Sequence, residues 1–202
     1  MKKLFLVVCL LFIVSSVPDV YAAKKKAAKP AKKVTLPTEA QWEWACRAGT
    51  STSMNYGAVD TDFSKSANLA DFSLGNYNGD PYIQDYKEAH TGNEENIYDH
   101  WVPWVKEVND GCFLQEQGGK FAANAWGLHD MHGNVAEWTR SVYKPYPYRA
   151  TDGRNDTATG KGERVVRGGS WFDRPKLSTS SFRRFYRDYQ KVYNVGFRVI
   201  VE

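Results

Sequence analysis

Cysteine is scarce in this chain of 202 residues, which contains only Cys9, Cys46 and Cys112. Small exported domains that depend on several disulfides need more, so a disulfide framework is excluded. Cys9 lies in an apolar leader, which leaves one pairing open, between Cys46 and Cys112. The sequence alone does not show whether these two residues lie close together.

Long apolar runs are also few. Leu4–Val17 follows Lys2 and Lys3, is short for a membrane span, and precedes a small-residue site that ends at Ala22. We therefore expect residues 1–22 to be a signal peptide, cleaved to leave a secreted or periplasmic protein without a membrane span. An uncleaved anchor is the alternative. A lipid-anchored cysteine is disfavoured because Cys9 lies inside the run.

The part of the chain after residue 33 has no excess of positive charge. Residues 23–33 read AKKKAAKPAKK, a low-complexity tether that we expect to be disordered. Residues 1–33 hold eight of the 27 basic residues and one of the 23 acidic residues. The remaining 19 basic and 22 acidic residues give positions 34–202 a net charge of −3. We therefore expect no nucleic-acid partner for this part.

Aromatic residues and glycine are plentiful. Seven Trp and 16 Gly in a chain that is 42% hydrophobic favour one loop-rich α+β domain, residues 34–202, in which large rings fix irregular backbone. Thr38 and Gln41 have the spacing of a capping box, and Gly49 is a stop signal, so residues 38–49 predict a helix. Trp42, Ala45 and Cys46 fall on its buried face.

The sequence signals for the other secondary-structure elements are weaker. Residues 50–108 predict loops, with Asn93–Asn96 as a solvated patch and Trp101 and Trp104 as core anchors. Residues 134–141 predict a short helix or turn. Residues 164–167 predict a strand that runs into a glycine bend, and residues 195–201 a closing strand.

The stretch from Gly127 to Trp138 combines turn residues with oxygen ligands. Gly133 and Asn134 favour a chain reversal, and the carboxylates of Asp130 and Glu137 lie seven residues apart. With the carbonyls of a bent loop they could bind one hard cation such as calcium. The alternative is a tight turn whose carboxylates face water, because the spacing is not that of an EF-hand loop. His129 and His132 are interpreted as turn residues.

Cationic and aromatic side chains alternate in residues 182–189, FRRFYRDY. Such a stretch can present a ligand surface through stacking and cation-π contacts. Arginine stems packed against rings inside the fold are the alternative.

Four blocks in order, LPTEAQWEWACRAGT, NAWGLHDMHGNVAEW, RVVRGGSW and VGFRV, together resemble the formylglycine-generating enzyme, or sulfatase-modifying factor, family. The resemblance implies an irregular fold similar to C-type lectin domains, stabilised by structural calcium. Ligands of one site would be the side chains of Asp130 and Glu137 with the carbonyls of Gly133 and Val135. Ligands of a second would be the side chains of Asn68 and Asp110 with the carbonyls of Leu69 and Cys112.

The chain departs from the catalytic pattern that this resemblance implies. Family enzymes that oxidise a cysteine to formylglycine bind copper(I) through two cysteines just after the GGS-aromatic block. Here Asp173 and either Ser178 or Thr179 stand at those positions, and no cysteine follows Cys112. Hard oxygen ligands do not replace thiolates for this soft ion, so we expect no copper and no formylglycine reaction.

A non-catalytic binding module for an unknown protein or glycan ligand is therefore the first hypothesis. Its expected ligand residues lie between the RGGSW and GFR blocks, as in similar domains of diversity-generating systems: Trp171, Phe172, Asp173, Arg183, Phe185, Tyr186, Arg187, Tyr189 and Tyr193.

Two alternatives remain open. One is an oxidoreductase or maturation factor of the sulfatase or siderophore type, although His90, His100, His129 and His132 show no metal-ligand spacing with carboxylates. The other is an accessory subunit. The N-terminal portion usual in the family has no counterpart before Val34, so the domain is expected to be either truncated, with a partner polypeptide that supplies the rest, or a minimal lectin-like module.

Overall fold

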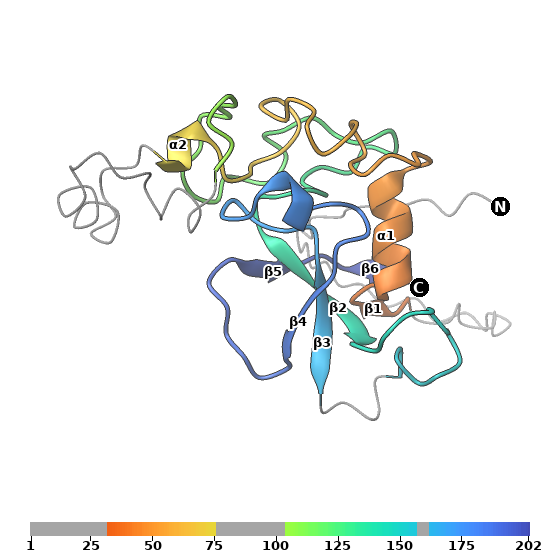
Figure 1. Cartoon of the computed structure of the whole chain (residues 1–202). Helices are drawn as coiled ribbons and strands as arrows, with labels where there is room; N and C mark the ends of the chain where they lie inside the picture. The colour runs from red at the N-terminus through yellow and green to blue at the C-terminus, as the bar shows by residue number, and fades with distance from the viewer. Residues whose placement is uncertain (1–31, 76–103, 157–161) are drawn as a thin grey trace, which may run out of the picture.

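Two small sheets and little helix form the folded part of the chain (Figure 1). The computed structural model describes residues 32–75, 104–156 and 162–202. The main sheet has the strand order β4-β3-β2-β5, and β1 and β6 form a second, two-stranded sheet. The described loops between α1 and β2 lie above the main sheet in the view of Figure 1. This is the expected α+β architecture. The elements are β1 (Val34–Thr35), α1 (Glu39–Arg47), α2 (Phe72–Gly75), β2 (Ala136–Val142), β3 (Glu163–Arg167), η2 (Pro175–Leu177), β4 (Arg184–Arg187), β5 (Val195–Phe197) and β6 (Ile200–Val201).

Helix α1 forms as its sequence predicts. The Thr38 hydroxyl accepts from the Gln41 amide at 3.1 Å, and the Gln41 side chain accepts from the Thr38 amide at 2.8 Å. This reciprocal pair satisfies two N–H groups at the start of the helix. The left-handed residue that ends α1 is Ala48, with φ 46°, followed by Gly49 with φ 96°. The predicted face is buried: Trp42, Ala45 and Cys46 form a cluster with Met131.

Strand β2 lies in the middle of the main sheet. It pairs antiparallel with β3, where Trp138 faces Val166, and parallel with β5, where Glu137 faces Gly196. The prediction of a short helix or turn over residues 134–141 is therefore wrong. The turn is confined to the residues before Ala136, and pairing on both sides satisfies the backbone groups of the strand that follows.

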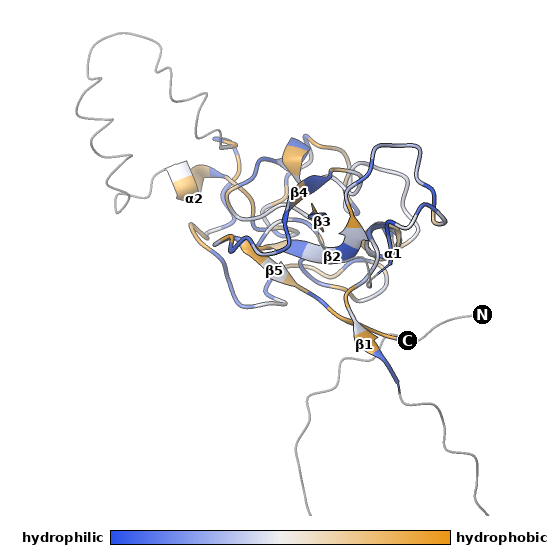
Figure 2. Cartoon of the chain, turned by 90° about the horizontal axis from the view of Figure 1, so that it is seen from below, coloured by the Kyte–Doolittle hydropathy of each residue, from blue (hydrophilic) through white to orange (hydrophobic). Residues whose placement is uncertain are grey.

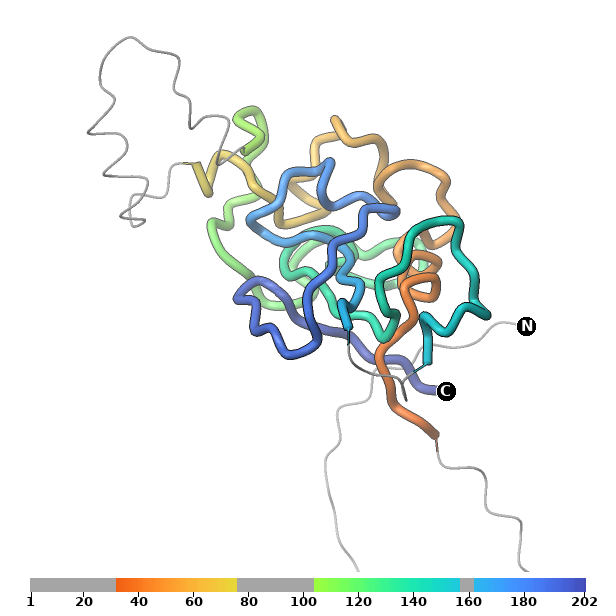
Figure 3. Tube along the Cα trace, turned by 60° about the horizontal axis from the view of Figure 1, so that its bottom comes forward, coloured from red at the N-terminus to blue at the C-terminus, as the bar shows by residue number. Residues whose placement is uncertain are grey.

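The predicted closing strand divides between the two sheets. β5 belongs to the main sheet, whereas β6 pairs with β1, Val34 facing Val201 and Thr35 facing Ile200. The first and last described segments thus lie side by side (Figures 2 and 3). This pairing holds the two ends of the domain together, and Arg140 adds an ion pair with Glu202 at 2.9 Å.

Within the described residues, buried apolar side chains form three small clusters that contribute to the core. Trp104 packs against one of them, with Trp171, which confirms its predicted role as an anchor. Cys46 and Cys112 are separate buried thiols, so the open disulfide pairing is not found. The Asn93–Asn96 patch, Trp101, His90 and His100 lie outside the described residues. Over the described ranges, no helix has the length and apolar character of a membrane span.

Candidate functional site

A left-handed turn occupies the centre of the structure. Asp130, Gly133 and Asn134 have φ values of 55°, 75° and 60°. The Gly133 amide donates to Gly168 at 2.9 Å, and the Asn134 amide donates to the Asn68 carbonyl at 2.8 Å. A Cβ on Gly133 would lie 2.0 Å from that carbonyl oxygen, so only glycine fits. The turn therefore joins the two regions in which the family resemblance implies calcium ligands.

The first set of expected calcium ligands is partly engaged by protein groups. Glu137 is buried, and its carboxylate accepts from Arg198 Nε at 2.5 Å, from Arg198 Nη2 at 2.6 Å and from Trp42 Nε1 at 2.7 Å. Asp130 Oδ2 accepts from the Gly119 amide at 2.7 Å, whereas its Oδ1 is buried without a hydrogen-bond partner. A cation bound here would share Glu137 with Arg198, alongside the carbonyls of Gly133 and Val135.

The second set of expected ligands is gathered in one corner. The side chain of Asn68 is fully buried, its Nδ2 donates to the Leu114 carbonyl at 2.9 Å, and its Oδ1 has no partner. The Asp110 carboxylate accepts from the Leu69 amide at 3.1 Å and from the Cys112 amide at 2.8 Å. An unpaired oxygen and a carboxylate therefore lie in the same corner.

A further acidic residue, Asp71, belongs to this corner and was not predicted. Its buried carboxylate accepts the amide hydrogens of Asp110 and Ser73. Burial, reinforced by the charge of Asp71, raises the pKa of Asp110 to about 7, and burial raises the pKa of Asp71 as well. Neighbouring carboxylates that resist ionisation together are a setting in which a bound cation relieves repulsion. The only sequence signal for Asp71 was its place three residues after Asn68.

The resemblance implies that Asp173 and either Ser178 or Thr179 stand where catalytic relatives bind copper, and Asp173 and Ser178 both make hydrogen bonds within the fold. Asp173 is buried and accepts from the Ser170 amide at 3.0 Å, from the Ser170 hydroxyl at 2.7 Å and from Arg184 at 2.8 Å. The Ser178 hydroxyl donates to the Arg174 carbonyl at 3.4 Å. Both positions therefore contribute to the hydrogen bonding of the loop, and neither supplies a soft ligand.

His132 lies in the bend before Gly133 and is a buried centre of hydrogen bonding, a role that the sequence did not predict. Its Nδ1 donates to the Ser178 carbonyl at 2.7 Å, and its Nε2 accepts from the Asn55 amide at 3.0 Å. This arrangement uses the neutral ring, and burial lowers the pKa of His132 to about 4. Cys46 Sγ lies 3.4 Å from Nε2, and burial raises the pKa of this thiol to about 12. The pair is therefore structural, since the thiolate is the nucleophilic form.

The expected ligand surface separates into exposed and enclosed side chains. Trp171 packs in a core cluster, Asp173 is ion-paired, and the Arg183 guanidinium makes two hydrogen bonds to buried Glu39, at 2.6 and 3.0 Å. These three side chains stabilise the fold. For Arg183 this agrees with the alternative that arginines of residues 182–189 pack inside the fold. Tyr186 is half-buried against Trp138. The residues left at the surface are Phe172, Phe185, Arg187, Tyr189 and Tyr193.

Clusters of three or more His, Cys, Asp or Glu side chains able to hold a metal ion do not occur in residues 32–75, 104–156 and 162–202. Any cation in the two corners would therefore depend on amide and carbonyl oxygens as well as carboxylates, which calcium accepts and transition metals accept less readily.

Comparison with known proteins identifies the family of the domain. Residues 17–202 match the model of the sulfatase-modifying factor enzyme 1-like domain. A formylglycine-generating enzyme of Mycobacterium tuberculosis is 32% identical over 111 residues, which are 55% of this chain and 28% of that protein. The inactive C-alpha-formylglycine-generating enzyme 2 of Mus musculus is 29% identical over 139 residues, 68% of this chain and 32% of that protein.

Solved structures share the fold at lower identity. Treponema denticola variable protein 1 superposes with a TM-score of 0.54 and 23% identity, over 83% of this chain and 47% of that one. PvdO from Pseudomonas aeruginosa gives a TM-score of 0.55 and 20% identity, over 85% of this chain and 53% of that one. This chain thus spans about a third of the curated relatives and about half of these structures.

Proposed function

We propose that this chain, which belongs to the sulfatase-modifying factor enzyme 1-like domain family, is an exported, non-catalytic ligand-binding domain. The observation that carries the proposal concerns Asp173 and Ser178, the latter being one of two candidates, with Thr179, for the second position. Oxygen ligands occupy the positions where catalytic relatives are expected to hold copper(I), and both are bonded within the fold. The similarity to an inactive relative in mouse also supports a non-catalytic role.

The ligand surface consists of the exposed rings that border the loop after β3. Tyr189 and Tyr193 are 71% and 73% exposed, and Phe172 and Phe185 are also exposed. Tyrosine and phenylalanine supply large contact areas at small cost in side-chain entropy, which suits a binding surface. A protein or glycan is the ligand class that such a surface fits.

A double substitution tests this surface. Binding of the chain to arrays of purified glycans and extracellular proteins is compared with that of the Phe172→Ser, Tyr193→Ser variant, whose altered side chains are at the surface. We expect at least one reproducible ligand for the unaltered chain and at least a tenfold loss in the variant. Equal binding by both would contradict the placement of the surface.

Calcium is proposed to stabilise the domain at the corner that contains Asn68 and Asp110. The unpartnered Asn68 Oδ1 and the raised pKa of Asp110 support this choice. With the carbonyls of Leu69 and Cys112, these groups form the oxygen set that calcium prefers. The corner at Asp130 is a weaker candidate because Arg198 already neutralises Glu137. At either corner the ion would have a structural role only.

An enzyme is the second candidate, because relatives named as catalysts match parts of the chain: the formylglycine-generating enzyme of Mycobacterium tuberculosis, and the hercynine oxygenase of the same organism, 34% identical over 80 residues, 38% of this chain and 19% of that protein. If the chain acts as a maturation factor, a partner polypeptide is proposed to supply the remaining part of the catalytic unit. An aldehyde assay with a cysteine-containing sulfatase peptide tests the formylglycine-generating form of this candidate.

A further inference from the structure

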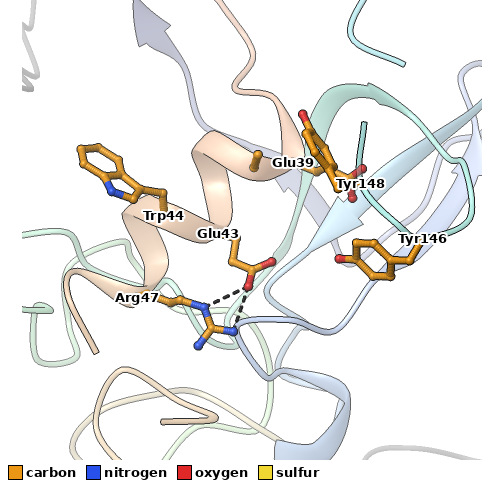
Figure 4. Close-up of a pocket in the computed structure, with 7 residues that line it drawn as sticks. Glu39, Glu43, Trp44, Arg47, Tyr146 and Tyr148 are labelled. Atoms are coloured by element: carbon orange, nitrogen blue, oxygen red, sulfur yellow. Dashed lines mark hydrogen bonds and ion pairs between the residues drawn. The ribbon is translucent and has the colours of Figure 1, made fainter. Parts of the chain in front are cut away.

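A hollow of about 400 Å³ lies beside α1, and its lining includes none of the expected calcium ligands and none of the exposed rings of the proposed ligand surface. One face of the helix, with Glu43 and Arg47, forms its floor (Figure 4). Trp44 lies to one side of this face, and Tyr146 and Tyr148 lie to the other (Figure 4). Its volume is that of a small-molecule site.

The tyrosine wall is fixed from behind by buried arginines. The Arg183 guanidinium lies 4.6 Å from the ring centre of Tyr143 and 4.5 Å from that of Tyr146, and it is held by Glu39. Arg154, which also pairs with Glu39, lies 4.6 Å from the ring centre of Tyr148. The rings therefore lose little freedom when a ligand arrives, which favours affinity.

Two aromatic side chains remain open to solvent on opposite sides of the hollow. Trp44 is 57% exposed and Tyr146 is 58% exposed. Trp44 also packs edge-on against Trp126, with ring centres 4.3 Å apart, which holds it in place. Exposed rings fixed by packing around a concave floor are unusual for a surface that binds nothing, because large apolar groups are normally turned inward.

The charges around the hollow are paired with one another. Glu39 is bound by Arg154 and Arg183. Glu43 is bound by Arg47 at 2.8 Å and by Arg167 at 2.5 Å. An anionic ligand would therefore have to compete with carboxylates for the arginines. A cationic ligand is disfavoured because the Tyr146 ring already interacts with the guanidinium of Arg183.

We infer that this hollow binds a neutral carbohydrate ring. The apolar C–H face of a sugar fits against the exposed rings of Trp44 and Tyr146, which supply contact without requiring charge. Sugar hydroxyls can donate to the Glu43 carboxylate, and Arg47 N–H groups can donate to sugar oxygens. The site is separate from the surface at Phe172 and Tyr193, so the two can be altered independently.

The test uses the full chain with two uncharged probes, maltotriose and triacetylchitotriose, and isothermal titration. We expect saturable binding of at least one probe. Trp44→Ala and Tyr146→Ala are expected to weaken it tenfold or more, whereas Tyr146→Phe, which keeps the ring, changes it less than threefold. Phe197→Ala, which removes another exposed ring on β5, is the control and leaves affinity unchanged.

Three results would overturn the inference. One is the absence of saturable binding for both sugars. A second is binding that persists in the Trp44→Ala, Tyr146→Ala double variant. The third is preferential binding of a charged probe, tetramethylammonium or inorganic phosphate, that these same substitutions abolish. This inference and the proposed function can fail separately. If the Trp44 and Tyr146 variants lose sugar binding but still bind the array ligand through Phe172 and Tyr193, the two sites are distinct.

Discussion

Arg198 makes two hydrogen bonds to the carboxylate of buried Glu137, at 2.5 and 2.6 Å, across 61 residues of sequence. The same guanidinium donates to the carbonyls of His129 and Asp130 at 3.1 and 3.2 Å. Arg198, which follows β5, thus binds the backbone of the central turn and neutralises the carboxylate of Glu137 in β2. A buried carboxylate bound by two hydrogen bonds from one guanidinium is a stronger interaction than a single exposed ion pair.

Removal of Arg198 is expected to be costly. Arg198→Met leaves the Glu137 carboxylate buried without its partner, so the free energy of unfolding should fall by about 3–5 kcal/mol. Urea denaturation measures the change. In the same assay Glu116→Gln, which breaks the exposed pair with Lys120 at 3.3 Å, should cost less than about 1 kcal/mol. Similar small losses in both variants would contradict the role of Arg198.

Gly133 is expected to tolerate no side chain. Gly133→Ala places a Cβ within 2.0 Å of the Asn68 carbonyl oxygen at a positive φ, which should cost about 3 kcal/mol or more. Gly127→Ala is the matched control, because its φ is also positive, 78°, but nothing lies within 4 Å of the added atom. Its cost should stay near 1 kcal/mol. Thermal unfolding of the two variants gives the comparison, and equal shifts in Tm would be evidence against this close approach.

Acid is expected to destabilise the domain through His132. The pKa of this residue in the folded state, about 4, lies below its ordinary value of 6.5. The unfolded chain therefore binds a proton between these two values when the folded chain does not, so stability is present above pH 6.5 and is lost as pH falls toward 4. The loss should be on the order of 3 kcal/mol. The free energy of unfolding is measured by denaturant titration at several pH values between 4 and 8. Its dependence on pH should be weaker for His132→Gln than for the unaltered chain. An unchanged dependence would assign the effect to other groups.

Calcium is expected to raise Tm relative to EGTA. An ion at 100 times its dissociation constant stabilises the folded state by about 2.7 kcal/mol. Asp110→Asn should abolish this rise because it removes the carboxylate of the corner. Asp60→Asn, at an exposed position outside the corner, should retain it. Identical Tm values of the unaltered chain in calcium and EGTA would remove the ion from the account.

Local patterns predicted those features whose causes lie close together in sequence. The capping box of α1 joins residues three apart, and the reversal at Gly133 and Asn134 needs only two adjacent backbone conformations. The family resemblance extended this to the fold class, because four separated blocks occur in the required order. Trp104 was placed in the core on its size and apolar character alone.

Features that depend on distant partners could not be derived in this way. Arg183 and Glu39 are 144 residues apart, so the sequence offered no reason to choose internal pairing over an exposed ligand surface. Strand β2 follows a turn, and only its neighbours β3 and β5 make it extended. His132 became a buried centre through contacts with Asn55 and Ser178, neither of which is adjacent to it in sequence.

The most direct test of the account is a formylglycine assay. The purified full chain, supplied with copper(I), oxygen and a cysteine-containing sulfatase peptide, is followed by mass spectrometry and aldehyde labelling, with a catalytically active family enzyme as the positive control. We predict that the peptide cysteine remains unconverted while the control enzyme yields the aldehyde. Conversion of the peptide by this chain would contradict the proposal that oxygen ligands, Asp173 and either Ser178 or Thr179, stand in place of the copper-binding cysteines.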